Sequence, residues 1–134
     1  MAKQRIAHLN STACYLKKDN KVLMIKFSKK WGQVYAPPGG KFETGESPLD
    51  CILREYYEET GLTLINPKLQ GISYWHDDYE GIIFIFVAEK IGKELLEYAI
   101  NDSKEKGKSG ICTLVSKKKK PFLGEKKFFE LFRI

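Results

Sequence analysis

Cysteine is scarce in this sequence, and histidine is scarcer still. The 134 residues include three cysteines and two histidines. The cysteines, Cys14, Cys51 and Cys112, are odd in number and widely separated, which argues against a disulfide framework and against a zinc site. We therefore expect free thiols in a reducing compartment and a cytoplasmic protein.

Long apolar runs are also missing. The longest strongly apolar run, residues 82–88, is far too short to span a membrane, and the first residues do not have the pattern of a signal peptide. Internal repeats and linker-like segments are absent as well. Apolar residues make up 43% of the chain and charged residues 30%, which argues against disorder. These features predict a single domain over residues 1–134 with no membrane partner.

The chain carries an excess of positive charge. Lysine and arginine number 23 against 17 acidic residues, for a net charge of +6, which favours anionic ligands such as nucleotides. The densest basic run, Lys117 to Lys120, contains no aromatic residue, and such runs are typical of a solvated loop. We therefore expect a small-molecule nucleotide partner and no nucleic-acid partner. For these lysines we expect only local electrostatic attraction of phosphates.

The most informative stretch is the acid-rich segment of 23 residues from Gly40 to Leu62. Glu55, Glu58 and Glu59 are spaced i, i+3 and i+4, so a helix would place them on one face. Like charges so placed repel by roughly 0.2–0.5 kcal/mol per pair. One arginine does not neutralise three glutamates, whereas a divalent cation such as Mg²⁺ would. The alternative is a solvated glutamate face on an ordinary amphipathic helix.

The ends of this helix are marked in the sequence. Ser47 is a suitable N-cap, Pro48 suits the first helical position, and Asp50 can complete a capping box. Gly61 is placed to end the helix in the left-handed conformation. An apolar stripe runs along another side of the helix, away from the glutamate cluster. Its members are Leu49, Ile52, Leu53, Tyr56 and Tyr57.

The same segment resembles the signature of one protein family. Nudix hydrolases carry a box written G-x5-E-x7-R-E-U-x-E-E-x-G-U, in which U is a bulky aliphatic residue. Every spacing of the box is kept here, and the one departure is Tyr56, where an aliphatic residue is usual. Because Tyr56 lies on the apolar stripe, we expect it to affect packing rather than chemistry. The matching residues are Gly40, Glu46, Arg54, Glu55, Glu58, Glu59, Gly61 and Leu62.

The resemblance implies a fold and a metal site. The fold would be α/β, an α/β/α sandwich with a central mixed β-sheet and the box as a loop and helix. Mg²⁺, with Mn²⁺ as the alternative, would be bound by the carboxylates of Glu55, Glu58 and Glu59 and by the main-chain carbonyl of Gly39. Which glutamate acts as general base differs among family members, and Glu55 is either a ligand or the base.

The resemblance also implies supporting roles for other residues. Arg54 would orient the glutamates by ion pairing, and Glu46 would support the loop. These two complete the predicted catalytic set with Glu55 and Glu58. The predicted substrate-binding residues are Gly40, Lys41, Trp31, Tyr35 and Asn10. For Trp31 and Tyr35, stacking on a base and anchoring of the loop remain equal alternatives, and for Asn10 the alternative is a half-buried strand face. Glu105 is the candidate for an additional acid in a loop before a late strand.

The rest of the chain predicts mainly strands. Residues 6–16 and 21–27 read as a hairpin turning at residues 17–20, and residues 37–40 should turn sharply. Residues 68–75 and 82–87 are further strand candidates, and the second has the continuous apolar pattern of a strand buried on both faces. Towards the end we expect a helical turn at 94–100, a polar loop at 101–110, a strand at 111–115 and a terminal helix within 122–134.

The expected activity is metal-dependent hydrolysis of a nucleoside diphosphate-linked substrate. By resemblance, a MutT-type enzyme would cleave a (d)NTP such as 8-oxo-dGTP to the monophosphate and pyrophosphate. Hydrolysis of ADP-ribose or of a dinucleoside polyphosphate is the alternative within the same chemistry. A module that binds nucleotides without turning them over is the alternative outside it. A homodimer is compatible with the family and is left open.

Overall fold

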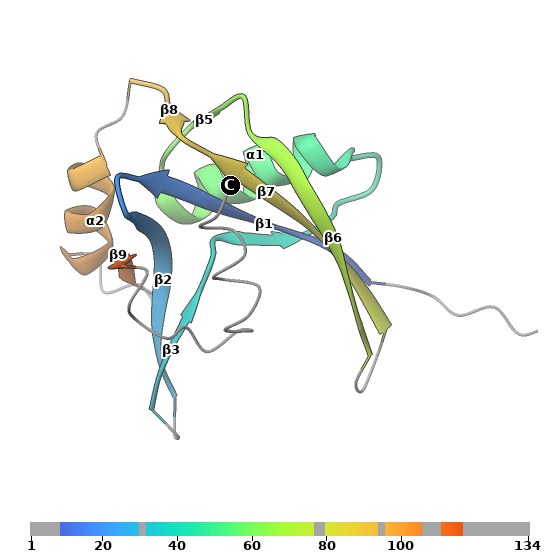
Figure 1. Cartoon of the computed structure of the whole chain (residues 1–134), viewed down its shortest axis with the longest axis horizontal. Helices are drawn as coiled ribbons and strands as arrows, with labels where there is room; N and C mark the ends of the chain where they lie inside the picture. The colour runs from blue at the N-terminus through green and yellow to red at the C-terminus, as the bar shows by residue number, and fades with distance from the viewer. Residues whose placement is uncertain (1–8, 30–31, 77–79, 94–95, 106–110, 117–134) are drawn as a thin grey trace, which may run out of the picture.

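The computed structural model describes residues 9–29, 32–76, 80–93, 96–105 and 111–116. Within these ranges the chain forms a seven-stranded sheet, a separate two-stranded sheet and two helices (Figure 1). The sheet contains both parallel and antiparallel pairs, which confirms the predicted mixed α/β fold. The strands are β1 (Leu9–Lys18), β2 (Lys21–Lys29), β3 (Gly32–Ala36), β4 (Gly39–Lys41), β5 (Leu64–Ile65), β6 (Lys68–His76), β7 (Glu80–Ala88), β8 (Lys90–Ile91) and β9 (Ile111–Ser116). The helices are α1 (Pro48–Thr60) and α2 (Leu96–Glu105).

The centre of the sheet is a parallel pair. β1 and β7 run side by side from Leu9↔Gly81 to Leu16↔Ala88, and the other pairings are antiparallel. The main strand order is β3-β2-β1-β7-β6, with β9 added beside β2 and β4 beside β1. β6 and β7 confirm the two strand predictions. Residue 81 and residues 86–88 of β7 are buried, and residues 82–85 between them are half-buried.

The predicted N-terminal hairpin is confirmed, with a shorter turn than expected. Asp19 and Asn20 form the turn, and Asp19 adopts a positive φ of 56°. β2 stays paired with β1 at only two positions, Lys17↔Val22 and Lys18↔Lys21. Beyond them β2 pairs with β3 and β9. The opening left along β1 is taken by β4, and this arrangement brings the glycines of the acid-rich segment into the sheet.

The expectation of a sharp turn over residues 37–40 is wrong in its second half. The bend is confined to Pro37 and Pro38, and Gly39 and Gly40 are extended residues of β4 that pair with Ala13 and Thr12. The reason is close packing rather than chain reversal. A Cβ at Gly39 would collide with the backbone of Thr12, so only glycine lets β4 approach β1 this closely.

Helix α1 begins and ends as the sequence predicts. Ser47 Oγ accepts a hydrogen bond from Asp50 N at 3.1 Å, and Asp50 Oδ2 accepts one from Ser47 N at 3.4 Å, which completes the capping box. Pro48 occupies the first turn. At the other end Gly61 is left-handed, with φ 76° and ψ 7°, and its N–H donates to Tyr57 O at 2.7 Å.

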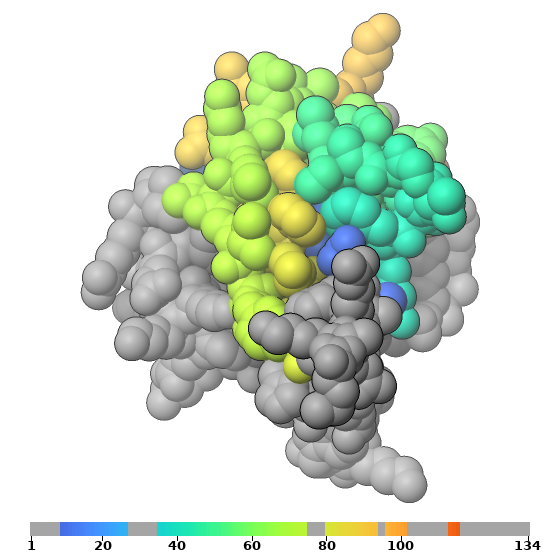
Figure 2. Space-filling view, turned by 90° about the vertical axis from the view of Figure 1, so that its right-hand side faces the viewer, coloured from blue at the N-terminus to red at the C-terminus, as the bar shows by residue number. Residues whose placement is uncertain are grey.

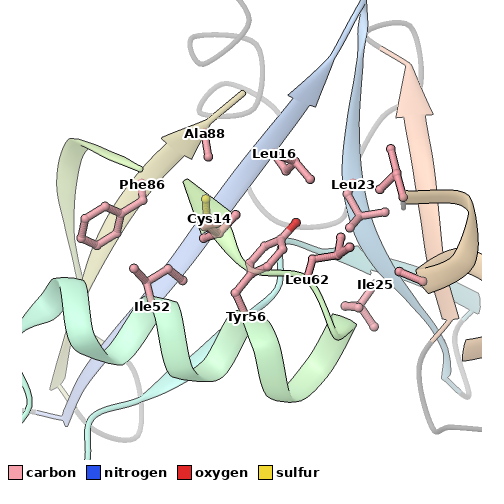
Figure 3. Close-up of a cluster of buried hydrophobic side chains, with 12 residues drawn as sticks. Cys14, Leu16, Leu23, Ile25, Ile52, Tyr56, Leu62, Phe86 and Ala88 are labelled. Atoms are coloured by element: carbon pink, nitrogen blue, oxygen red, sulfur yellow. The ribbon is translucent and has the colours of Figure 1, made fainter. Parts of the chain in front are cut away.

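The buried side of α1 is narrower than the predicted stripe. Ile52 and Tyr56 are fully buried against β1 and β7 side chains such as Cys14 and Phe86 (Figure 3). Burying a side chain of this size contributes roughly 1.5–3 kcal/mol. Leu49 and Tyr57 were expected on the same stripe, but they are 44% and 56% exposed. They lie at the margins of the stripe, where the sheet no longer covers the helix; Cys51, which is fully buried, takes part instead.

The second helix is longer than expected. The short helical turn predicted at residues 94–100 extends to Glu105 as α2, so the predicted loop is wrong for residues 101–105. Leu96 and Ala99 are buried in the same core as α1, and this packing outweighs the polar composition that follows them. The short β5–β8 pairing was not predicted. β9 confirms the strand expected at residues 111–115.

Some sequence predictions lie outside the described residues. They concern the lysine run at 117–120 and the terminal helix within 122–134. None of the helices described is long and apolar enough to cross a membrane.

The left-handed cap of α1 gives a first prediction. Replacing Gly61 by alanine should lower the free energy of unfolding by about 1 kcal/mol, because a Cβ is disfavoured at positive φ although no atom lies within 4 Å of it. Gly71→Ala is the matched control, since that site in β6 is equally open and its φ is not positive. Urea unfolding of both variants is the measurement. Equal losses at the two sites would contradict the account of the cap.

Candidate active site

The candidate site is formed by β4, the loop that follows it and one face of α1. The loop folds back on itself, because Glu46 N donates to Glu43 O at 3.1 Å and Glu43 N donates to Glu46 Oε1 at 2.7 Å. This turn brings the Glu46 carboxylate beside the second turn of α1. The sequence therefore places an acid from the loop next to the acids of the helix.

Arg54 is the centre of the site. Its Nε and Nη2 donate to the two carboxylate oxygens of Glu46 at 2.6 and 2.8 Å, in the bidentate geometry that favours arginine over lysine. Nη1 donates to Glu55 Oε1 at 3.0 Å and to Glu58 Oε2 at 3.2 Å, and Nη2 donates to Lys41 O at 3.0 Å. One guanidinium thus ties together the loop, β4 and two acids of α1.

The charges of this cluster are reflected in the pKa values of its members. The hydrogen bonds from Arg54, then the one from the Glu43 backbone, lower the pKa of the Glu46 carboxyl to about 2. The same bond to Glu46 raises the pKa of Arg54 above its ordinary value. Glu46 and Arg54 therefore form an ion pair at neutral pH that joins the loop to α1.

Glu55 lies directly against the backbone of β4. A Cβ built on Gly40 would overlap the Glu55 carboxylate, so the glycine leaves the room that this carboxylate occupies. The side chain of Glu55 is only 17% exposed. The carboxylate is therefore held between Arg54 on one side and β4 on the other.

Glu59 has the most perturbed carboxyl of the helix. Burial raises its pKa to about 7, and the negative charges of Glu55 and Glu58 act in the same direction. A hydrogen bond from the backbone N–H of Gly39 opposes this shift. Arg54 does not compensate the charge of Glu59, so this end of the cluster has more negative charge than its fixed cation balances.

The donor set fits a small divalent cation. Glu55, Glu58 and Glu59 supply hard carboxyl oxygens beside the main chain of Gly39, and Arg54 donates hydrogen bonds to the first two of them. Within the described ranges, no three acidic, histidine or cysteine side chains converge on one point as they stand. The carboxylate of Glu58 is turned towards Arg54, and its side chain is 56% exposed.

The structure brings together most of the predicted site residues. The Arg54 guanidinium donates hydrogen bonds to Glu46, Glu55, Glu58 and Lys41, and Gly39, Gly40 and Glu59 adjoin this group. Glu43, which the sequence analysis did not single out, belongs to the same cluster, with its Oε1 3.5 Å from Arg54 Nη1. The one sequence feature that could have indicated Glu43 is its position three residues before Glu46 in the same loop.

The other residues predicted at the site do not all lie in this cluster. Tyr35 is 6% exposed and packs with Tyr15 and Met24 in a second core cluster, which agrees with the anchoring alternative. Asn10 is exposed on β1, where its carbonyl accepts a hydrogen bond from Phe42 N at 3.1 Å. Glu105 is the last residue of α2 and not part of a loop. Trp31 lies outside the described residues.

The surface beside the site is partly open. In Figure 2, β7 (yellow) and the start of β1 (blue) are visible between β6 (green) and the segment that leads from β4 into α1 (teal). Phe84 of β7 is half-buried and contacts Phe42, with 5.5 Å between ring centroids.

Comparison with known proteins agrees with these observations. The chain is 41% identical over 85 residues to the uncharacterized Nudix hydrolase YvcI of Bacillus subtilis, a match that covers 58% of this chain and 52% of that protein. It is 38% identical over 94 residues to a protein of Methanocaldococcus jannaschii named ADP-ribose pyrophosphatase, with coverage of 67% and 54%. The chain therefore spans about half the length of these two relatives.

The fold has counterparts among solved structures. The crystal structure of a MutT protein from Bacillus halodurans matches 94% of this chain and 80% of its own, at 28% identity and a TM-score of 0.68. The solution structure of the Escherichia coli ORF135 protein matches 96% of this chain at 13% identity and a TM-score of 0.72, which concerns the fold alone. The sequence pattern of the family described as the NUDIX domain matches residues 7–116, and the chain belongs to this family.

Proposed function

We propose that the chain is a metal-dependent hydrolase of nucleoside diphosphate-linked substrates. The observation that carries this proposal is the cluster around Arg54, in which the carboxylates of α1 lie against the main chain of β4. Family membership supports the same chemistry, since Nudix hydrolases generally use divalent metal ions. A site that only bound nucleotides would have no need for so many mutually repelling acids.

We assign a role to each residue of the cluster from its contacts. Glu58 and Glu59, with the Gly39 carbonyl, would hold Mg²⁺ or Mn²⁺. When bound, such an ion supplies positive charge to the phosphate oxygens and acidifies water. Arg54, fixed by Glu46, keeps Glu55 and Glu58 in place. Glu55 is held beside the site by two contacts, and we assign it the role of ligand or general base.

The preferred substrate class is a (d)NTP, including 8-oxo-dGTP, cleaved to the monophosphate and pyrophosphate. The structural likeness to the Bacillus halodurans MutT protein over nearly the whole chain supports this choice. A second candidate is ADP-ribose, because the Methanocaldococcus jannaschii relative is named for that substrate. Cleavage at a diphosphate is common to both candidates, and only the group attached to the diphosphate differs.

A substrate panel with Mg²⁺ tests the proposal. It contains canonical dNTPs and NTPs, 8-oxo-dGTP, ADP-ribose and Ap4A, and pyrophosphate and phosphate are detected separately. Pyrophosphate release with preference for 8-oxo-dGTP at sub-saturating concentration is the expected result. Turnover of ADP-ribose or Ap4A alone would keep the chemistry and replace the substrate. Nucleotide binding without any turnover would refute the proposal in favour of a binding module.

Removing one carboxylate of α1 should separate chemistry from folding. Glu58→Gln is expected to lower kcat by at least about 100-fold, because a ligand for the metal ion is lost. Its free energy of unfolding should stay within about 0.5 kcal/mol of the original protein, since the side chain is mostly exposed. Glu97→Gln on the exposed side of α2 is the matched control and should leave kcat unchanged. Near-normal turnover by Glu58→Gln would exclude Glu58 as a ligand.

The Arg54–Glu46 pair predicts a pH dependence of stability. The folded-state pKa of Glu46 lies near 2, below its ordinary value of 4.5, so the unfolded chain binds the proton more readily. The stabilisation by this pair is therefore present above about pH 4.5 and lost as the pH falls towards 2. Urea unfolding between pH 2 and 6 should show this loss, and Glu46→Gln should reduce the slope. An identical slope in the variant would contradict the role assigned to the pair.

A further inference from the structure

A buried hydroxyl on β1 holds β4, the strand that borders the acid cluster. Thr12 of β1 is 3% exposed, and its Oγ1 donates a hydrogen bond to the carbonyl of Gly40 at 3.2 Å. Thr12 and Gly40 are direct partners across the β1–β4 pair. The Thr12 side chain therefore lies on the face of the sheet to which a Cβ at Gly40 would point. In the described ranges, Thr12 and Thr60 are the buried polar residues.

Helix α1 contacts the same carbonyl. Cys51 is fully buried, and its Sγ lies 3.4 Å from Thr12 Oγ1 and 3.7 Å from the carbonyl oxygen of Gly40. Burial raises the pKa of the Cys51 thiol, so the thiol keeps its proton and is available as a weak donor. The carbonyl of Gly40 is therefore held between a side chain of β1 and a side chain of α1.

Each residue of β4 carries one contact to the acid cluster. The N–H of Gly39 bonds to Glu59, the Cα of Gly40 lies against the carboxylate of Glu55, and the carbonyl of Lys41 accepts from Arg54 Nη2 at 3.0 Å. Because these contacts come from three consecutive residues of one short strand, a shift of β4 relative to α1 would change all of them together. The middle residue, Gly40, is the one that Thr12 fixes.

We propose that Thr12 is a positioning residue of this site: its hydroxyl locks the Gly40 carbonyl and thereby sets the distance between the backbone of β4 and the carboxylates of α1. The inference rests on the proposed function. It concerns how the acids are placed, and it does not make Thr12 a group that touches substrate.

The test compares Thr12→Val, which keeps the shape and removes the hydroxyl, with Thr12→Ser, which keeps the hydroxyl. Thr12→Val should lower kcat about tenfold or more with KM changed by less than about twofold, because the acids are misplaced while the substrate still binds. The dissociation constant for Mn²⁺, measured by electron paramagnetic resonance without substrate, should rise at least about threefold. Thr12→Ser should stay within about threefold of the original protein in both quantities.

Thr60→Val is the matched control for a purely structural effect. The Thr60 hydroxyl is also buried, donates to Tyr56 O at 2.7 Å and accepts from Leu62 N at 3.1 Å, and neither of these partners belongs to β4. Its loss should lower the melting temperature while leaving kcat and Mn²⁺ affinity unchanged. If Thr12→Val does not fold, Cys51→Ala replaces it, because this variant removes the other contact to the Gly40 carbonyl and should lower kcat and weaken Mn²⁺ binding in the same direction.

Three results would overturn the inference. The first is normal kcat and Mn²⁺ affinity in Thr12→Val, or in Cys51→Ala if Thr12→Val does not fold. The second is an equal loss of kcat and Mn²⁺ affinity in Thr12→Ser and Thr12→Val. The third is a loss of kcat in Thr60→Val as large as that in Thr12→Val. Absence of turnover in the original protein would instead refute the proposed function. In that case the Mn²⁺ affinities of the same variants still decide between support and rejection of the inference.

Discussion

The structure around the box depends on one imbalance of charge. Glu46, Glu55, Glu58 and Glu59 belong to one acidic cluster, and Arg54 donates hydrogen bonds to the first three. The fourth carboxyl, that of Glu59, accepts a hydrogen bond from the Gly39 N–H, but burial and the charges of Glu55 and Glu58 raise its pKa. Such an arrangement is unfavourable for folding by itself, because removing carboxylates from water costs free energy. A bound divalent cation would offset this free-energy cost.

The same imbalance explains the shape of the neighbouring backbone. The backbone of β4 lies close to β1 and to the carboxylates of α1 at Gly39 and Gly40, where side chains would collide with Thr12 and Glu55. The β1–β2 hairpin contributes by separating after two paired positions, which opens the edge of β1 for β4. The capped helix then fixes the acids at the height of this strand. Sheet topology and helix capping thus serve a single geometric requirement.

The sequence predicted the parts of this arrangement that are governed by local rules. The caps of α1, the turn at Asp19 and the strands β6 and β7 follow from residue type and periodicity, and the box spacing indicated which acids meet. It did not predict which residues of the stripe the sheet would cover, so Leu49 and Tyr57 were misplaced. It also missed the extended Gly39–Gly40 pair, because strand pairing with β1 is a long-range contact that no local pattern encodes. The extension of α2 depended on tertiary packing in the same way.

Mapping where a paramagnetic ion binds would test the central claim most directly. Mn²⁺ added in small amounts to ¹⁵N-labelled protein broadens the amide signals closest to it. The account predicts that the amides of Gly39, Gly40 and residues 55–59 broaden first, and that Mg²⁺ in excess restores them. Broadening that begins elsewhere on the sheet, or that spreads evenly over the surface, would contradict the assignment of the metal site to the face of α1 that meets β4.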